Sequence, residues 1–141
     1  MNAFLPSPGA KRPMRIFVVE NHEDPRFLLC LLLEQLGHTV FSSATLADAL
    51  KTLPGTHCDV LISDIGLPDG NGWDLRTRLA DDRPAYAIAM SGFGMSSDRQ
   101  RSLNVGYRHH LLKPVEPNQL ERLLDEAADE VRESARGGSV S

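Results

Sequence analysis

The chain has 141 residues, of which 41% are hydrophobic and 24% are charged, and its formal net charge is −4. This length suits one domain, and the acidic balance argues against general nucleic-acid binding, which usually requires a basic face. The longest apolar run, Phe27 to Leu33, is far too short to cross a bilayer, and the first residues lack the apolar core of a signal peptide. We therefore expect a cytoplasmic protein that binds neither nucleic acid nor membrane.

Two segments at the ends of the chain differ in composition from the part between them. Residues 1–12 contain two prolines and a glycine without hydrophobic periodicity, and residues 134–141 end in small and polar side chains. Such segments bury too little apolar surface to become ordered, so both are predicted to be disordered tails. The part between them, residues 13–133, is predicted to form a single domain.

Short apolar runs alternate with helix-like stretches along this domain. The run at 15–19 is almost entirely apolar, as expected for a strand that is buried on both faces of a parallel sheet. A helix is predicted after it, with Asp24 as its N-cap and Gly37 as its stop. Strands are predicted at 15–19, 38–41, 59–63, 86–90 and 108–112, and helices at 25–36, 46–53, 72–80, 96–104 and around 120–131.

Five consecutive strand–helix units predict an α/β fold with a parallel sheet covered by helices on both faces. The flavodoxin-like strand order 2-1-3-4-5 is the simplest topology for such a chain, and ligands bind such sheets at the carboxyl ends of the strands. Polar side chains follow four of the predicted strands at those ends: Glu20, Asn21, Asp64, Ser91 and Lys113. The sequence therefore predicts that these residues converge on one pocket.

The residues of this pocket favour phosphoryl chemistry. Oxygen ligands around a small pocket suit Mg²⁺, and a carboxylate beside that cation can attack a phosphoryl group and form an aspartyl phosphate. The segments that hold the pocket residues resemble the receiver domains of two-component signalling, and the resemblance covers residues 14–132. These segments are VVENHEDPRFLLCLLLEQLGH, LISDIGLPDGNGWDL, AMSGFG and HHLLKPVEP.

The resemblance implies a role for each residue that surrounds the phosphoryl group. Asp64 is the expected phosphoacceptor, Lys113 is expected to neutralise charge, and Ser91 is the hydroxyl that contacts the phosphoryl group. His110 holds the place of the switch aromatic, which is expected to turn inward when Ser91 moves. The peptide bond between Lys113 and Pro114 is a candidate for the cis form.

The resemblance also implies a Mg²⁺ site made by Glu20, Asn21, Asp64 and the backbone carbonyl of Gly66. Members of this family normally have a second aspartate where this chain has Asn21, so weak Mg²⁺ binding is expected. Two function hypotheses follow. The first is a single-domain response regulator, not otherwise an enzyme, that accepts a phosphoryl group on Asp64. The alternative is a phosphorylation-independent protein-interaction module. A hydrolase of the aspartyl-phosphate type is disfavoured, because Gly66 stands where such enzymes have another aspartate.

The first predicted helix carries more apolar residues than one buried face requires. Leu28, Leu29, Leu32, Leu33 and Leu36 suffice to cover the sheet. Phe27, Cys30 and Leu31 then remain for an exposed strip, which commonly marks a partner site. The resemblance implies that a histidine kinase or a histidine phosphotransfer protein docks on this strip. The output is expected to be a contact with a downstream protein, made by a monomer or a weak dimer.

Overall fold

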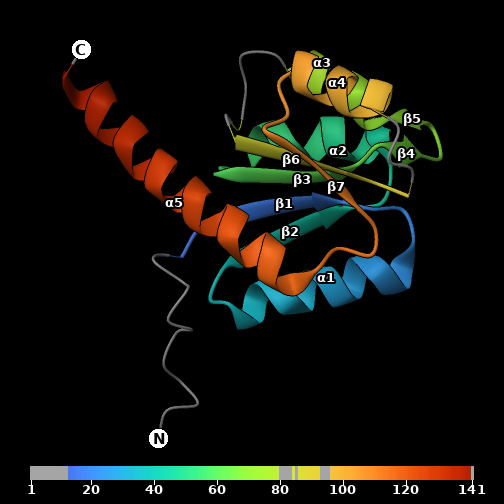
Figure 1. Ribbon diagram of the computed structural model, residues 1–141, viewed down its shortest axis with the longest axis horizontal. Coiled ribbons are helices and arrows are strands. Elements are labelled where there is room, and N and C mark those ends of the chain that lie inside the picture. Colours follow the sequence, from blue (N-terminus) through green and yellow to red (C-terminus); the bar gives the residue numbers. More distant parts are fainter. Residues whose placement is uncertain (1–12, 80–83, 85, 93–95, 141) are drawn as a thin grey trace, which may run out of the picture.

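A sheet of five parallel strands forms the centre of the computed structural model, which describes residues 13–79, 84, 86–92 and 96–140 (Figure 1). The strand order is β2-β1-β3-β6-β7, with β1 (Arg15–Val19), β2 (Thr39–Ser43), β3 (Val60–Asp64), β6 (Tyr86–Ser91) and β7 (His109–Leu112). A separate hairpin joins β4 (Gly66–Leu67) to β5 (Gly70–Asn71). When the hairpin is left out of the count, the order is 2-1-3-4-5, so the predicted flavodoxin-like fold is confirmed.

Helices cover both faces of this sheet (Figure 1). One layer contains α1 (Glu23–Gln35) and α5 (Pro117–Val140), and the other contains α2 (Leu46–Thr52) with its short extension at Leu53–Gly55, α3 (Gly72–Leu79) and α4 (Ser96–Asn104). Successive side chains of a strand point to opposite faces, so each strand contributes to two cores. In β1, Ile16 and Val18 pack with α1 and α5, whereas Phe17 and Val19 pack with α2 and α3.

The helix α1 begins earlier than predicted. Its first residue is Glu23 and its N-cap is His22, which makes no side-chain capping bond, so the prediction of Asp24 as the cap is wrong. The physical reason lies at the end of β1, where the carboxylate of Glu20 accepts a hydrogen bond from the backbone N–H of His22 and fixes the chain there. The predicted stop at Gly37 is confirmed by its φ of 100°, a conformation that glycine adopts readily.

The helix α5 is longer than predicted. It spans Pro117–Val140, whereas the apolar pattern predicted a helix only around 120–131. Glycine weakens a helix by only about 1 kcal/mol relative to alanine, so Gly137 and Gly138 do not prevent its continuation. Neither α5 nor any other helix in the described part of the chain is long and apolar enough to span a membrane. The other predicted tail, residues 1–12, lies outside the described residues.

The face that α1 turns to the sheet also differs from the prediction. Leu29, Leu32 and Leu36 pack against the core and Leu33 is fully buried, but Leu28 is 62% exposed. Each residue rotates an α-helix by about 100°, which places Leu28 at the edge of the buried stripe. Leu28 therefore belongs to the exposed surface of α1 and does not cover the sheet as expected.

This assignment predicts different effects for two leucines of the same helix. Leu33→Ala removes a fully buried side chain and is expected to lower the free energy of unfolding by about 2–5 kcal/mol. Leu28→Ala is the matched control and is expected to lower it by less than about 1 kcal/mol. Urea unfolding followed by circular dichroism measures both values. Equal losses would contradict the orientation of α1.

Candidate functional site

Four strands deliver polar side chains to one edge of the sheet. Glu20 follows β1, Asp64 and Ser91 are the last residues of β3 and β6, and Lys113 follows β7. Because the strands are parallel and adjacent, their carboxyl ends meet at this edge. The structure brings Glu20, Asp64, Ser91 and Lys113 together, which are four of the five residues that the sequence predicted to converge.

An ion-pair cluster holds the centre of the site. The ammonium Nζ of Lys113 lies 2.5 Å from Oδ2 of Asp64 and also donates to Oε1 of Glu20. The two acids are almost fully buried, with exposed fractions of 1% for Glu20 and 5% for Asp64. A buried carboxylate is costly unless it is paired, so one ammonium must serve both acids. The peptide bond that follows Lys113 is cis, as expected for Lys113–Pro114.

Burial and pairing act differently on the two acids. Burial works to raise the pKa of Glu20, but hydrogen bonds from Lys113 and from the backbone N–H of His22 outweigh it, and the pKa is lowered. For Asp64, burial outweighs the bond from Lys113, the charge of Glu20 adds to it, and the pKa is raised. Burial would lower the pKa of Lys113, but the two carboxylates raise it. Asp64 is therefore the acid whose charge is less well compensated.

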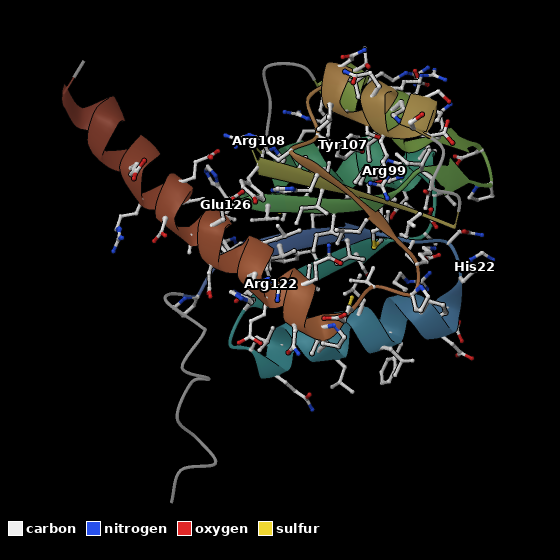
Figure 2. All side chains as sticks on the ribbon, in the orientation of Figure 1. His22, Arg99, Tyr107, Arg108, Arg122 and Glu126 are labelled. Atoms are coloured by element: carbon white, nitrogen blue, oxygen red, sulfur yellow. The ribbon has the colours of Figure 1, made fainter. Side chains whose placement is uncertain are left out.

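The residues at this edge have donor atoms that suit a divalent cation. One ligand atom each from Glu20, His22 and Asp64 lie within 4.8 Å of one another, and Figure 2 shows His22 beside the start of α1. Asn21 stands between Glu20 and His22 in the sequence, and it is half-buried in the structure. Carboxylate and amide oxygens with open positions fit a hard cation such as Mg²⁺. Gly66 contacts the site through its N–H, which lies 3.2 Å from Oδ1 of Asp64.

His22 was not predicted to belong to this cluster. Its spacing from the other histidines in the sequence does not indicate a metal site. The backbone turn after β1 nevertheless places Nδ1 of His22 3.1 Å from Oε2 of Glu20. The only sequence signal was its position two residues after Glu20.

The backbone around Asp64 leaves little space. A Cβ atom added at Gly72 would come within 2.5 Å of the carbonyl oxygen of Asp64. The first residue of α3 must therefore be a glycine for the helix to start this close to the acid. Asp69, in the same loop, accepts hydrogen bonds from the backbone N–H groups of Leu46 and Ala47 and so anchors the start of α2.

A cavity of about 440 Å³ opens beside the ion-pair cluster. Its lining joins the acid and the ammonium to a hydroxyl and two aromatic rings: Asp64, Lys113, Ser91, His110 and Trp73 are among its walls. The hydroxyl Oγ of Ser91 lies 2.7 Å from Nε2 of His110. His110 therefore contacts Ser91 at the wall of the cavity, and its expected inward turn when Ser91 moves remains a prediction.

The exposed surface of α1 differs in one residue from the predicted strip. Phe27 and Leu31 are exposed as expected, and Leu28 joins them. Cys30 instead packs against the core under α1, where burial raises the pKa of its thiol. The reason is that Cys30 faces β2, which covers that side of the helix. We call Phe27, Leu28 and Leu31 the α1 surface. A groove of about 550 Å³ beside it runs to Lys113 and Pro114.

The fold and the site together define a flavodoxin-like α/β protein with a buried acidic pocket at the carboxyl edge of its sheet. A family model for the response regulator receiver domain matches residues 16–125. The chain therefore belongs to the response regulator receiver domain family.

Individual relatives agree with this assignment. An uncharacterised 14.6 kDa protein of Leptolyngbya boryana is 33% identical over 80% of this chain and 88% of that protein. The sensor histidine kinase RcsC of Escherichia coli is 30% identical over 86% of this chain, which spans only 13% of the kinase. Among solved structures, a CheY-like receiver domain protein of Methanospirillum hungatei has a TM-score of 0.81 at 27% identity, over 87% of this chain and 99% of that one.

The raised pKa of Asp64 predicts how stability depends on pH. Below the usual value of 3.8, Asp64 is protonated in the folded and the unfolded protein, and Asp64→Asn should change stability little. As the pH rises through the raised folded pKa, the wild type loses stability relative to Asp64→Asn, because only the wild type must hold a buried carboxylate. Thermal unfolding of both proteins in EDTA from pH 3 to 8 measures this difference.

Asp69→Asn is a control variant that is expected to change stability with pH in the opposite direction to Asp64→Asn. Hydrogen bonds from the N–H groups of Ala47 and Leu46 lower the pKa of Asp69, so its charge stabilises the fold above pH 3.8. This variant should be less stable than the wild type at neutral pH, and the difference should vanish in acid. A wild type that is more stable than Asp64→Asn at pH 7 would show that Asp64 is not penalised by burial.

Proposed function

We propose that this protein is a cytoplasmic response regulator whose receiver domain accepts a phosphoryl group on Asp64 and signals through a phosphorylation-dependent protein contact. The observation that carries the proposal is the position of Asp64, which lines the cavity and lies 2.5 Å from the ammonium of Lys113. Phosphoryl transfer needs positioning and charge neutralisation more than covalent help, and this pair provides both.

The transfer replaces one bond to phosphorus with another. A carboxylate oxygen of Asp64 attacks the phosphorus atom of a phosphohistidine, the P–O bond forms as the P–N bond breaks, and the donor imidazole keeps the electron pair. Lys113 neutralises charge on the phosphoryl oxygens, and Ser91 donates a hydrogen bond to one of them. No enzymatic activity beyond this reaction and the loss of the same phosphoryl group is proposed.

Mg²⁺ is the proposed cofactor, and Glu20, Asp64, Asn21 and the carbonyl of Gly66 would hold it. The cation would supply positive charge to the phosphoryl oxygens. An amide at Asn21 lacks the charge of the usual aspartate. Two unit charges 4 Å apart interact by about 4 kcal/mol at an effective dielectric near 20, before desolvation is subtracted, so weak Mg²⁺ binding is expected.

The proposed phosphodonor is a histidine kinase or a histidine phosphotransfer protein that docks on the α1 surface. Leu28 lines the groove that leads to Lys113, and Phe27 and Leu31 are exposed on the same helix. A partner bound there would hold its phosphohistidine near the pocket. Sensor kinases such as RcsC contain a segment similar to this chain, which supports a partner from the same signalling system. The protein is proposed to act as a monomer or a weak dimer, without nucleic-acid or membrane binding.

Direct phosphorylation tests the central claim. Incubation with Mg²⁺ and acetyl phosphate should add one phosphoryl group to the wild type, as measured by intact mass, because the pocket needs only a reactive donor. Asp64→Asn should remain unlabelled. Asp69→Asn, which alters an acid of the adjoining loop, should be labelled like the wild type.

Asn21→Asp forms a second arm of this experiment. The restored charge should tighten Mg²⁺ binding by about tenfold, equivalent to about 1.4 kcal/mol, as measured by calorimetry. If the wild type takes no phosphoryl group even from histidine kinases, while Asn21→Asp does, the protein is a phosphorylation-independent interaction module whose metal site Asn21 has weakened.

Kinase docking predicts a defect that depends on the donor. Leu31→Glu places a charge on the α1 surface and should slow transfer from a phosphorylated histidine kinase by about tenfold, or about 1.4 kcal/mol. Its labelling by acetyl phosphate should not change. Leu103→Glu on α4 is the matched control, because Leu103 is 49% exposed and Leu31 is 39% exposed. Equal transfer rates for both variants would exclude the α1 surface as the docking site.

A further inference from the structure

A line of hydrogen-bonded side chains runs from the phosphorylation pocket to the chain's single tryptophan. Oγ of Ser91 lies 2.7 Å from Nε2 of His110, and Nδ1 of the same imidazole lies 2.7 Å from Oγ of Ser102. The indole Nε1 of Trp73 lies 2.9 Å from Oγ of Ser102. The four side chains come from β6, β7, α4 and α3, so the line joins both sides of the pocket.

The chemistry of the indole sets the direction of the bonds. An indole N–H can only donate, so Oγ of Ser102 accepts from Trp73. Ser102 is fully buried, and among the residues that the structure describes its hydroxyl has one further partner, Nδ1 of His110. If Nδ1 carried a proton, the hydroxyl proton of Ser102 would face a second donor and be left buried without an acceptor. Ser102 therefore donates to Nδ1.

This direction fixes the tautomer of His110. In a neutral imidazole one nitrogen accepts and the other donates. With Nδ1 as the acceptor, Nε2 carries the proton and donates to Oγ of Ser91. Ser91 also lines the cavity that contains Asp64, so its own hydroxyl proton is directed to an acceptor other than His110.

We propose that His110 is a positioning residue whose tautomer, set by Ser102 and Trp73, makes Ser91 a hydrogen-bond donor toward a phosphoryl oxygen on Asp64. The inference rests on the proposed function for the identity of that oxygen, but the tautomer does not depend on phosphorylation. A phenyl or phenol ring in place of His110 has no ring nitrogen and cannot orient Ser91 in this way. The imidazole of His110 therefore orients the hydroxyl of Ser91 in addition to packing beside it.

The tautomer can be measured in the unphosphorylated protein at pH 7. Two-dimensional ¹H–¹⁵N spectra of protein labelled at its five histidines distinguish a protonated from an unprotonated ring nitrogen, and His110→Gln assigns the signals. The expected result is an unprotonated Nδ1 and a protonated Nε2 on His110. A proton on Nδ1, alone or together with Nε2, would overturn the proposal.

Substitutions at Ser102 and Trp73 test whether these two residues set the tautomer of His110. Ser102→Ala removes the donor to Nδ1, and Trp73→Phe removes the indole N–H while keeping an aromatic ring. Both should shift the ¹⁵N signals of His110 toward a mixture of tautomers. Ser102→Thr retains the hydroxyl and should restore the wild-type signals, provided that its thermal unfolding shows a folded protein. Unchanged signals in both Ser102→Ala and Trp73→Phe would show that the line does not set the tautomer.

A phosphoryl analogue tests the effect on the pocket. Beryllofluoride with Mg²⁺ should bind the wild type and change the fluorescence of Trp73, and Ser102→Ala should bind it about five- to tenfold more weakly. Equal affinity would overturn the positioning role. If the wild type binds no beryllofluoride and also takes no phosphoryl group, the proposed function fails, while the tautomer measurement still decides the orientation of Ser91 independently.

Discussion

The bridge between Lys113 and the two buried acids is the interaction on which the rest of the site depends. Glu20 and Asp64 come from different strands, and each would carry an uncompensated charge in the interior without the ammonium between them. Even with this bridge, the pKa of Asp64 is raised, so the negative charge of Asp64 is less fully compensated than that of Glu20. The negative charge of Asp64 is therefore expected to attract a cation to this edge of the sheet, beside the proposed phosphoacceptor.

The parallel sheet explains why so few residues can build this pocket. Strands β1, β3, β6 and β7 end at one edge, so a single residue at or just after the end of each strand is enough to assemble the two acids, the hydroxyl and the ammonium. Gly72 allows α3 to start against the backbone of Asp64, and Asp69 anchors α2 to the same loop. The starts of α2 and α3 are thus tied directly to the segment that follows Asp64.

His110 lies between two serine hydroxyls, one at the pocket and one on α4. A histidine at this position has two ring nitrogens, and both are within hydrogen-bonding distance of a serine. The ring is therefore held from two sides, by the pocket and by α4, and Trp73 fixes the outer serine. Asn21 directly follows Glu20, and the resemblance to receiver domains implies an aspartate at its position. An amide there carries no charge.

The sequence by itself determined the order of strands and helices, and with it the positions of Glu20, Asp64, Ser91 and Lys113, because apolar periodicity is local and strand ends in a parallel sheet share one edge. The packing around α1 settles which of its apolar residues are exposed, since Leu28 and Cys30 lie at opposite edges of the buried stripe and only Cys30 packs against the core. Only the tertiary structure decided that His22 contacts Glu20 and that Ser102 joins Trp73 to His110. Those contacts depend on backbone turns and on packing between distant segments, for which the local pattern carries no signal.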